Sequence, residues 1–271
     1  MRTVVQISDL HFGAILEPTL EPLVRYLHEL RPDLTIVSGD LTQRARPSQF
    51  AEAKAYLKRL PVPQLVIPGN HDVPLYDILR RFAAPFARYD QYISPEHNPH
   101  FIDDEIAVVG INSAHSFTFK GGKLGEEAVR NAARRLSGLR GQVRIVVTHH
   151  PFDIPVGLSG VTIVEGAEHA VRVFAGCDVD LFLTGHLHLV HHAPASVFVK
   201  DYHAQMLVSG TAVSTRARGE PNSFYVFRID HMQNDDKCLG VETHSWNAAR
   251  NCFELTATRS APRTSRARAA E

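Results

Sequence analysis

The stretch Val4-Val5-Gln6-Ile7-Ser8-Asp9-Leu10-His11 begins as a short, mainly apolar run and then brings the polar side chains of Ser8, Asp9 and His11. An apolar run of about 4–8 residues that is bounded by polar residues is typical of a buried strand. The run is shorter than the apolar region of about 7–15 residues that a signal peptide requires, so it predicts a strand and not a targeting segment. We expect the turn after it to bring Asp9 and His11 close enough to bind one metal ion.

Much of the chain repeats this pattern, with apolar runs separated by segments of helical period. Apolar side chains three and four residues apart, as at Leu20, Leu23 and Leu27, predict the helices. Alternating strands and helices favour an α/β fold with a largely parallel sheet. The expected strands are residues 4–7, 34–37, 65–67, 106–111, 145–147 and 181–183, and the expected helices begin near Leu20, Pro47, Pro74 and Val129.

The pattern changes after residue 188. Residues 206–208, 223–229 and 239–244 are typical of consecutive strands without helices between them. They predict a second sheet that packs against the first. We expect residues 1–258 to form a single domain. The arginine-rich segment 259–271 predicts a disordered tail, with an arm that binds nucleic acid as the alternative.

Polar side chains follow five of the expected strands. In open α/β sheets, ligands bind at the carboxyl ends of the strands, so these side chains are expected in one crevice. A single histidine in a loop is more often a hydrogen-bonded structural residue than a ligand, but five such segments in order are hard to assemble from independent turns. The segments are Asp9-Leu10-His11, Gly39-Asp40, Gly69-Asn70-His71-Asp72, Thr148-His149-His150 and Gly185-His186-Leu187-His188.

The ligand types in these segments indicate a metal centre. Imidazole, carboxylate and amide oxygen are ligands that suit manganese, iron, zinc or cobalt. A site for a softer ion would use thiolate ligands instead. The candidate ligands are too many for one tetrahedral ion, so they predict two sites that share one carboxylate. The candidates are Asp9, His11, Asp40, Asn70, His149, His186 and His188.

Composition narrows the class of protein. The chain has 271 residues and a formal net charge of zero, which argues against a chain-wide surface for nucleic acid. No stretch approaches the roughly 18 apolar residues of a membrane span, so we expect a cytoplasmic protein without a membrane partner. Cys177, Cys238 and Cys252 have no paired spacing and are expected to be reduced structural thiols.

The five segments together resemble the calcineurin-like metallophosphoesterase superfamily, over residues 4–188. The chain length, the Gly69-Asn70-His71-Asp72 form and the block His149-His150-Pro151 are closest to class III 3′,5′-cyclic nucleotide phosphodiesterases and related glycerophosphodiesterases. The resemblance implies a four-layer αββα sandwich of two mixed sheets flanked by helices.

The resemblance also implies a role for each candidate. Asp40 would bridge the two ions, and His71 would face the substrate as a catalytic residue. The first ion would be held by Asp9, His11, Asp40 and His188, and the second by Asp40, Asn70, His149 and His186. The chain departs from the protein phosphatases of this superfamily at Gln43, where they carry an aspartate that supports the catalytic histidine. Arg44 matches the arginine of that block and either clamps a phosphate oxygen or is simply solvated.

We therefore expect a dinuclear phosphoesterase that hydrolyses a small phosphodiester, a 3′,5′-cyclic nucleotide or a glycerophosphodiester. A hydroxide that bridges two metal ions would attack phosphorus. Manganese and iron fit best as the ions, with zinc and cobalt as alternatives. The loops at residues 113–122, 153–165 and 211–222 are expected to shape the pocket.

Three other functions stay open. A nuclease would require a basic channel, and a lipid-precursor pyrophosphatase would require an exposed apolar and basic segment. A metal-binding regulatory module without turnover is the third. A homodimer is one option for the assembly.

Overall fold

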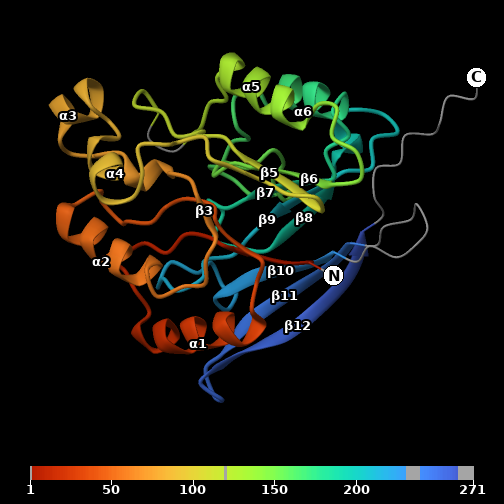
Figure 1. Ribbon diagram of the computed structural model, residues 1–271. Coiled ribbons are helices and arrows are strands. Elements are labelled where there is room, and N and C mark those ends of the chain that lie inside the picture. Colours follow the sequence, from red (N-terminus) through yellow and green to blue (C-terminus); the bar gives the residue numbers. More distant parts are fainter. Residues whose placement is uncertain (1, 119–120, 230–238, 262–271) are drawn as a thin grey trace, which may run out of the picture.

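Two six-stranded sheets form the centre of the protein and lie face to face between two layers of helices (Figure 1). The computed structural model describes residues 2–118, 121–229 and 239–261. This arrangement confirms the predicted αββα sandwich. The prediction that residues 206–208, 223–229 and 239–244 form the second sheet was wrong, because residues 223–229 and 239–244 extend the sheet that contains residues 4–7, and residues 206–208 pair with residues 182–184 in the other sheet.

The first sheet has the strand order β12-β11-β10-β1-β2-β3. Strands β1, β2 and β3 pair in parallel, and β10, β11 and β12 add an antiparallel half through the pairing of β10 with β1. The bounds are β1 Arg2–Ile7, β2 Leu34–Val37, β3 Gln64–Val66, β10 Ser223–Ile229, β11 Leu239–Asn247 and β12 Cys252–Ala261, with helices α1 Leu20–Leu30 and α2 Pro47–Leu57 on the outer face.

The second sheet has the order β4-β5-β6-β7-β9-β8, with parallel strands at its centre and one antiparallel strand at each edge. Helices α5 and α6 cover its outer face (Figure 1). The bounds are β4 His100–Ile102, β5 Ile106–Gly110, β6 Val143–Val147, β7 Leu181–Thr184, β8 His191–Pro194, β9 Gln205–Val208, α5 Glu126–Leu136 and α6 Ala167–Ala175. The remaining helices are α3 Ile78–Ala83, α4 Ala87–Tyr92 and the 3-10 turns Glu17–Thr19, Asn70–Asp72 and Ala195–Val197.

Apolar side chains fill all three interfaces between the four layers. The central interface holds side chains from both sheets, such as Ile36 and Leu65 from one and Ile145 and Leu183 from the other. The strands are apolar on both faces because both faces are covered, which explains why they appear as continuous apolar runs in the sequence. This packing fixes the position of one sheet relative to the other. It thereby also fixes the positions of the loops at the strand ends.

The prediction of a helix that begins at Pro74 was wrong in its start and in its buried face. Helix α3 begins at Ile78. The preceding residue, Asp77, caps the helix by accepting a hydrogen bond from the Arg80 backbone N–H at 3.2 Å. The apolar side chains of Ile78 and Leu79 are 64% and 85% exposed. The helix instead buries Arg81, which donates hydrogen bonds to backbone carbonyl groups. Helical period shows which residues share a face, but not whether another element covers that face.

The start of the predicted tail at residue 259 was also wrong. Strand β12 continues to Ala261, and Arg259 and Ser260 pair with Val241 and Gly240 of β11. Backbone hydrogen bonds to β11 stabilise the strand whatever its arginine content. Residues 262–271 of the predicted tail lie outside the described residues, as does Cys238. Helices α4 and α6 and strands β4, β8 and β12 were not predicted. In the part of the chain that the structure describes, none of the helices combines the length and apolar character needed to cross a membrane.

The packing of Phe182 makes a test of the second sheet. This fully buried ring contacts the rings of Phe152 and Phe174 at centroid distances of 4.9 and 6.0 Å. Replacing it with alanine should lower the free energy of unfolding by about 3–5 kcal/mol, because the cavity cannot close fully. Urea unfolding of metal-free protein measures the change. The matched control Leu79→Ala should change stability by less than about 0.5 kcal/mol, and a similar loss in both variants would contradict the described packing.

Candidate metal centre

The predicted ligands lie where five strands end, three from the first sheet and two from the second. Strands β1, β2 and β3 lead to Asp9, Asp40 and Asn70, and strands β6 and β7 lead to His149 and His186. The backbone hydrogen bond from Asp9 N–H to Gly39 carbonyl is 3.1 Å long, and that from Gly185 N–H to His149 carbonyl is 3.0 Å long. These bonds fix neighbouring turns against one another.

Five of the seven predicted ligands have a left-handed backbone. Residues other than glycine rarely adopt positive φ, and they are found in this region mostly where function requires it. The ligand side chains are thus directed by the turns themselves. The φ values are 55° at Asp9, 50° at His11, 52° at Asp40, 73° at His186 and 57° at His188.

The first group contains Asp9, His11, Asp40 and His188, whose ligand atoms all lie within 4.8 Å of one another. The Nε2 atom of His188 lies 3.1 Å from Asp9 Oδ1. The Nε2 atom of His11 lies 3.6 Å from Asp9 Oδ1 and 3.6 Å from Asp40 Oδ2. All four side chains are buried. The structure therefore brings together the predicted ligands of the first ion.

The second group contains Asn70, His149 and His186, and it also faces Asp40. The Oδ1 atom of Asn70 lies 3.2 Å from His149 Nε2 and 3.0 Å from His186 Nδ1. The Nε2 atom of His149 lies 3.4 Å from Asp40 Oδ1. One oxygen of Asp40 thus faces each group, which is the position that a bridging ligand requires.

Unpaired polar atoms test whether these residues fit a metal ion. Asp9 Oδ1 and Asp40 Oδ2 are buried and have no hydrogen-bond partner among the described residues. A buried carboxylate oxygen without a partner is costly. The Nε2 atoms of His11 and His188 face each other at 3.0 Å. Cations between these carboxylate oxygens and ring nitrogens would satisfy both, so the residues fit the metal ions that the predicted site requires.

Burial and charge set the protonation of the ligands. Burial lowers the pKa of His11 to about 4 and that of His186 to about 3, so both rings are neutral at neutral pH. Burial opposes ionisation of Asp40, but His149 and the other nearby histidines outweigh it and hold the pKa of this carboxyl well below its usual range. Burial likewise opposes protonation of His149, but the Asp40 carboxylate raises its pKa to about 9. Neutral imidazoles and ionised carboxylates are the forms that bind metal, whereas His149 must lose a proton when it does so.

Asp72 holds the loops after β2 and β3 together, a role that the sequence did not predict. Its Oδ2 atom accepts hydrogen bonds from the backbone N–H of Leu41 at 3.1 Å and of Gly69 at 2.9 Å. Its Oδ1 atom accepts from Thr42 N–H at 2.9 Å. These bonds position the turns that carry Asp40 and Asn70.

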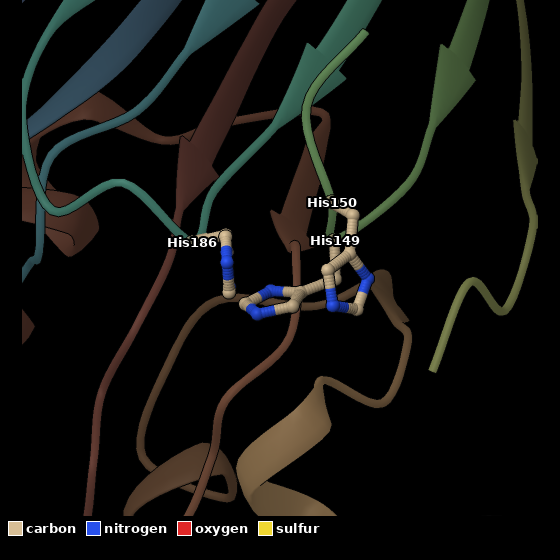
Figure 2. A group of neighbouring side chains, drawn as sticks. All are labelled: His149, His150 and His186. Atoms are coloured by element: carbon tan, nitrogen blue, oxygen red, sulfur yellow. The ribbon is translucent and has the colours of Figure 1, made fainter. Parts of the chain in front are cut away.

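His150 was not among the predicted ligands, but it lies with His149 and His186 in a group of three histidines. Figure 2 shows its ring beside that of His149, with His186 approaching from another loop. The ring centroids of His150 and His186 are 4.7 Å apart. Ring atoms of His149, His150 and His186 could hold an ion. The Nδ1 atom of His150 is 2.9 Å from Ser113 Oγ, so only its Nε2 atom remains for such an ion.

A cavity of about 450 Å³ opens onto the ligands. Arginines 216 and 218, which the sequence did not predict individually, belong to the loop at residues 211–222. Two of the three loops that we expected to shape the pocket contribute to it, and the described residues of the loop at 113–122 do not. The lining residues are Asp40, Gln43, Arg44, Asn70, His71, Leu75, Gly160, Val161, Thr162, His186, His188, Arg216 and Arg218.

His71 lies in this cavity and contacts Gln43 and Arg216. Its Nδ1 atom is 2.8 Å from the Gln43 backbone carbonyl oxygen, and its Nε2 atom is 3.0 Å from Arg216 Nη1. A carbonyl oxygen only accepts hydrogen bonds and a guanidinium only donates them. His71 therefore carries its proton on Nδ1 and accepts at Nε2. The group that accepts this proton is therefore a backbone carbonyl and not a carboxylate.

Residues 2–190 match the calcineurin-like phosphoesterase family. The chain belongs to this family. All seven predicted ligands and His71 fall inside the matched range. This confirms the predicted resemblance and the prediction that the chain is an enzyme that acts on phosphoester bonds.

Two relatives of this phosphoesterase each share 28% of the aligned residues with it. Over 203 residues it is 28% identical to "Probable glycerophosphodiester phosphodiesterase GpdQ" of Arcobacter nitrofigilis, which covers 69% of this chain and 72% of the relative. Over 240 residues it is 28% identical to "cAMP/cGMP dual specificity phosphodiesterase MT0825" of Mycobacterium tuberculosis, covering 79% and 72%. The solved structure of purple acid phosphatase PPD1 from yellow lupin (Lupinus luteus) seeds superposes with a TM-score of 0.73 at 13% identity, over 96% of this chain and 53% of the lupin chain, which supports the fold alone.

The position of Asp40 between the two ligand groups predicts how metal content responds to mutation. Elemental analysis of metal-replete phosphoesterase should approach two ions per chain. Asp40→Ala should lower occupancy at both sites, whereas His188→Ala should lower mainly the first. His203→Ala, a change at an exposed histidine, is the control and should retain full metal content. A firm stoichiometry of one ion, unchanged by added Mn²⁺, would contradict the two-site arrangement.

Proposed function

We propose that this phosphoesterase hydrolyses a small phosphodiester, a 3′,5′-cyclic nucleotide or a glycerophosphodiester, at a dinuclear metal centre. The observation that carries the proposal is the position of Asp40, with one oxygen toward each ligand group. The names of the relatives from A. nitrofigilis and M. tuberculosis support both substrate types.

The described residues divide the work of the proposed reaction. When bound, two ions would lower the pKa of a water molecule and neutralise phosphoryl oxygens. Asp9, His11, Asp40 and His188 would hold one ion, and Asp40, Asn70, His149 and His186 the other. Arginine side chains line the cavity beside them, so it can bind a phosphate group.

His71 and Arg216 would act on the phosphoryl group as a pair. Because Nε2 of His71 accepts from Arg216, this ring has no proton to donate toward the cavity in the described arrangement. Arg216 does, and its guanidinium also donates to the Gln43 side chain at 3.2 Å. The pair therefore favours stabilisation of charge on the phosphoryl oxygens over protonation of the leaving alkoxide by His71.

A lipid-precursor pyrophosphatase is the second candidate, because of one observation. The exposed apolar side chains of Leu79 and Phe82 lie on α3, and the nearby residue Leu75 lines the cavity. Phe82 and the exposed Phe117 are in ring contact at 5.2 Å. Such a patch beside a polar pocket can bind an amphiphilic substrate.

Three further expectations from the sequence stay predictions. They are manganese or iron as the ions, a cytoplasmic location and a homodimer.

A substrate screen tests the proposed function. With Mn²⁺ added, the protein should release p-nitrophenol from bis-p-nitrophenyl phosphate and hydrolyse either cyclic nucleotides or glycerophosphodiesters. Chelation followed by dialysis should abolish turnover, and restored Mn²⁺ should recover it. Full metal occupancy with no turnover on any diester would favour the regulatory module instead. Faster cleavage of duplex DNA than of small diesters would favour the nuclease.

The His71→Ala variant separates metal binding from chemistry. As a residue that is not a predicted ligand, His71 can be removed without emptying either site. The variant should keep near-normal metal content and lose about 10²–10⁴-fold in kcat. Because charge stabilisation does not depend on the leaving group, the loss should be similar for nitrophenolate and alkoxide leaving groups. A loss confined to poor leaving groups would restore protonation as its main role, and normal kcat would remove His71 from the mechanism.

A further inference from the structure

Two arginines of the cavity have no assignment in the proposed reaction. Arg44 and Arg218 line the same cavity as Arg216 and the metal ligands. Among the described residues, neither of them forms an ion pair with a carboxylate. A guanidinium without an acidic partner in a pocket is a binding group for an anion.

Arg44 contacts an aromatic ring. Its guanidinium carbon lies 5.3 Å from the centroid of the Tyr76 ring, a cation–π contact. This contact occupies a face of the guanidinium and leaves its N–H edge available. A planar guanidinium edge suits bidentate binding of phosphate or carboxylate oxygens.

Arg218 lies far from Arg44 in the sequence but lines the same cavity. Its backbone N–H donates to the carbonyl oxygen of His188 at 3.4 Å, which ties this segment to a metal ligand. Arg218 is exposed, so it can reach a group that extends toward the cavity mouth.

The electrostatics of the cavity are unbalanced toward positive charge. Three arginines, Arg44, Arg216 and Arg218, line the cavity. The one carboxylate among its described lining residues is that of Asp40, which metal ions would offset. An anionic ligand would therefore offset the charge of the guanidinium groups.

A simple phosphodiester has one negative charge, on the phosphate that is cleaved. The bound metal ions and Arg216 would already neutralise this charge. We propose that Arg44 and Arg218 form a subsite for a second phosphate group on the substrate, remote from the bond that is cleaved. The preferred substrate would then be a phosphodiester with an additional terminal phosphate. This inference rests on the proposed phosphodiesterase function. A cavity of about 450 Å³ is large enough for a substrate of nucleotide size.

A matched pair of substrates tests the subsite. Thymidine 5′-(p-nitrophenyl phosphate) carries one negative charge, and its 3′-phosphorylated counterpart adds only the remote phosphate. Hydrolysis of either releases p-nitrophenol from the same ester. The 3′-phosphorylated compound should have a kcat/KM at least about 10-fold higher, mainly through a lower KM, as expected for hydrogen bonds to a charged group. Equal values for the two substrates, or a lower value for the phosphorylated one, would overturn the subsite.

Variants locate the preference. Arg44→Gln and Arg218→Gln should each reduce the ratio of the two kcat/KM values, and the double variant should bring it close to one. Arg130→Gln is the control, because Arg130 is 65% exposed on α5 and pairs with Glu126 outside the cavity. Its ratio should equal that of the unmodified protein. Arginine variants that lower both kcat/KM values equally would assign Arg44 and Arg218 to the cleaved phosphate and overturn the subsite.

A binding titration separates the subsite from the chemistry. Metal-free protein should bind thymidine 3′,5′-bisphosphate at least about 10-fold more tightly than thymidine 5′-monophosphate, and the double variant should lose this difference. If neither nitrophenyl ester were hydrolysed, the proposed function would fail while this titration still decided on the subsite. Equal affinity for the two nucleotides would overturn it.

Discussion

The buried carboxylate of Asp40 is the group on which the rest of the site depends. A charge without access to water is costly unless donors or cations surround it. The His71 backbone N–H donates to its Oδ1 atom at 2.8 Å, and histidines from both sheets lie around it. Gly69 allows this approach, since a Cβ at that position would lie 2.2 Å from Asp40 Oδ1. The ligand groups can therefore form only when the strand ends of the two sheets meet at Asp40.

The same requirement explains the strained backbone around the site. Each left-handed ligand costs conformational energy, and such residues persist only where the surrounding structure fixes them. Here the apolar interface between the sheets fixes the strands, and the four hydrogen bonds that Asp72 accepts fix the turns after β2 and β3. The predicted ligands are thus held close to one another by the protein alone. Such preorganisation would lower the cost of binding ions, at the expense of stability in their absence.

The sequence predicted those features that depend on local pattern, and missed those that depend on distant contacts. Asp9 and His186 could be predicted because each ends an apolar run, and parallel strands that end together place their next residues in one crevice. The contact of Arg216 with His71 joins residues 145 positions apart, through a loop with no regular period. Helix α3 failed for the opposite reason: its apolar period was clear, but the residue that it buries is Arg81. The seven ligands and their assignment to two ions stay predictions, for which the distances around Asp40 are the support.

The division of the chain at residue 190 bears on how this enzyme would choose its substrate. The family match ends there, and it contains Asp40, His71 and the other ligand positions. Arg216 and Arg218 lie beyond it, in the loop that follows β9, yet they line the same cavity. The chemistry of phosphoester cleavage requires only the groups around phosphorus. Selection among phosphoesters requires groups that contact the rest of the substrate, and on this chain the cavity offers such groups from both sides of residue 190, Arg44 before it and Arg218 after it. Family membership therefore indicates the bond that is attacked, whereas the proposed subsite at Arg44 and Arg218 would select the molecule that presents it.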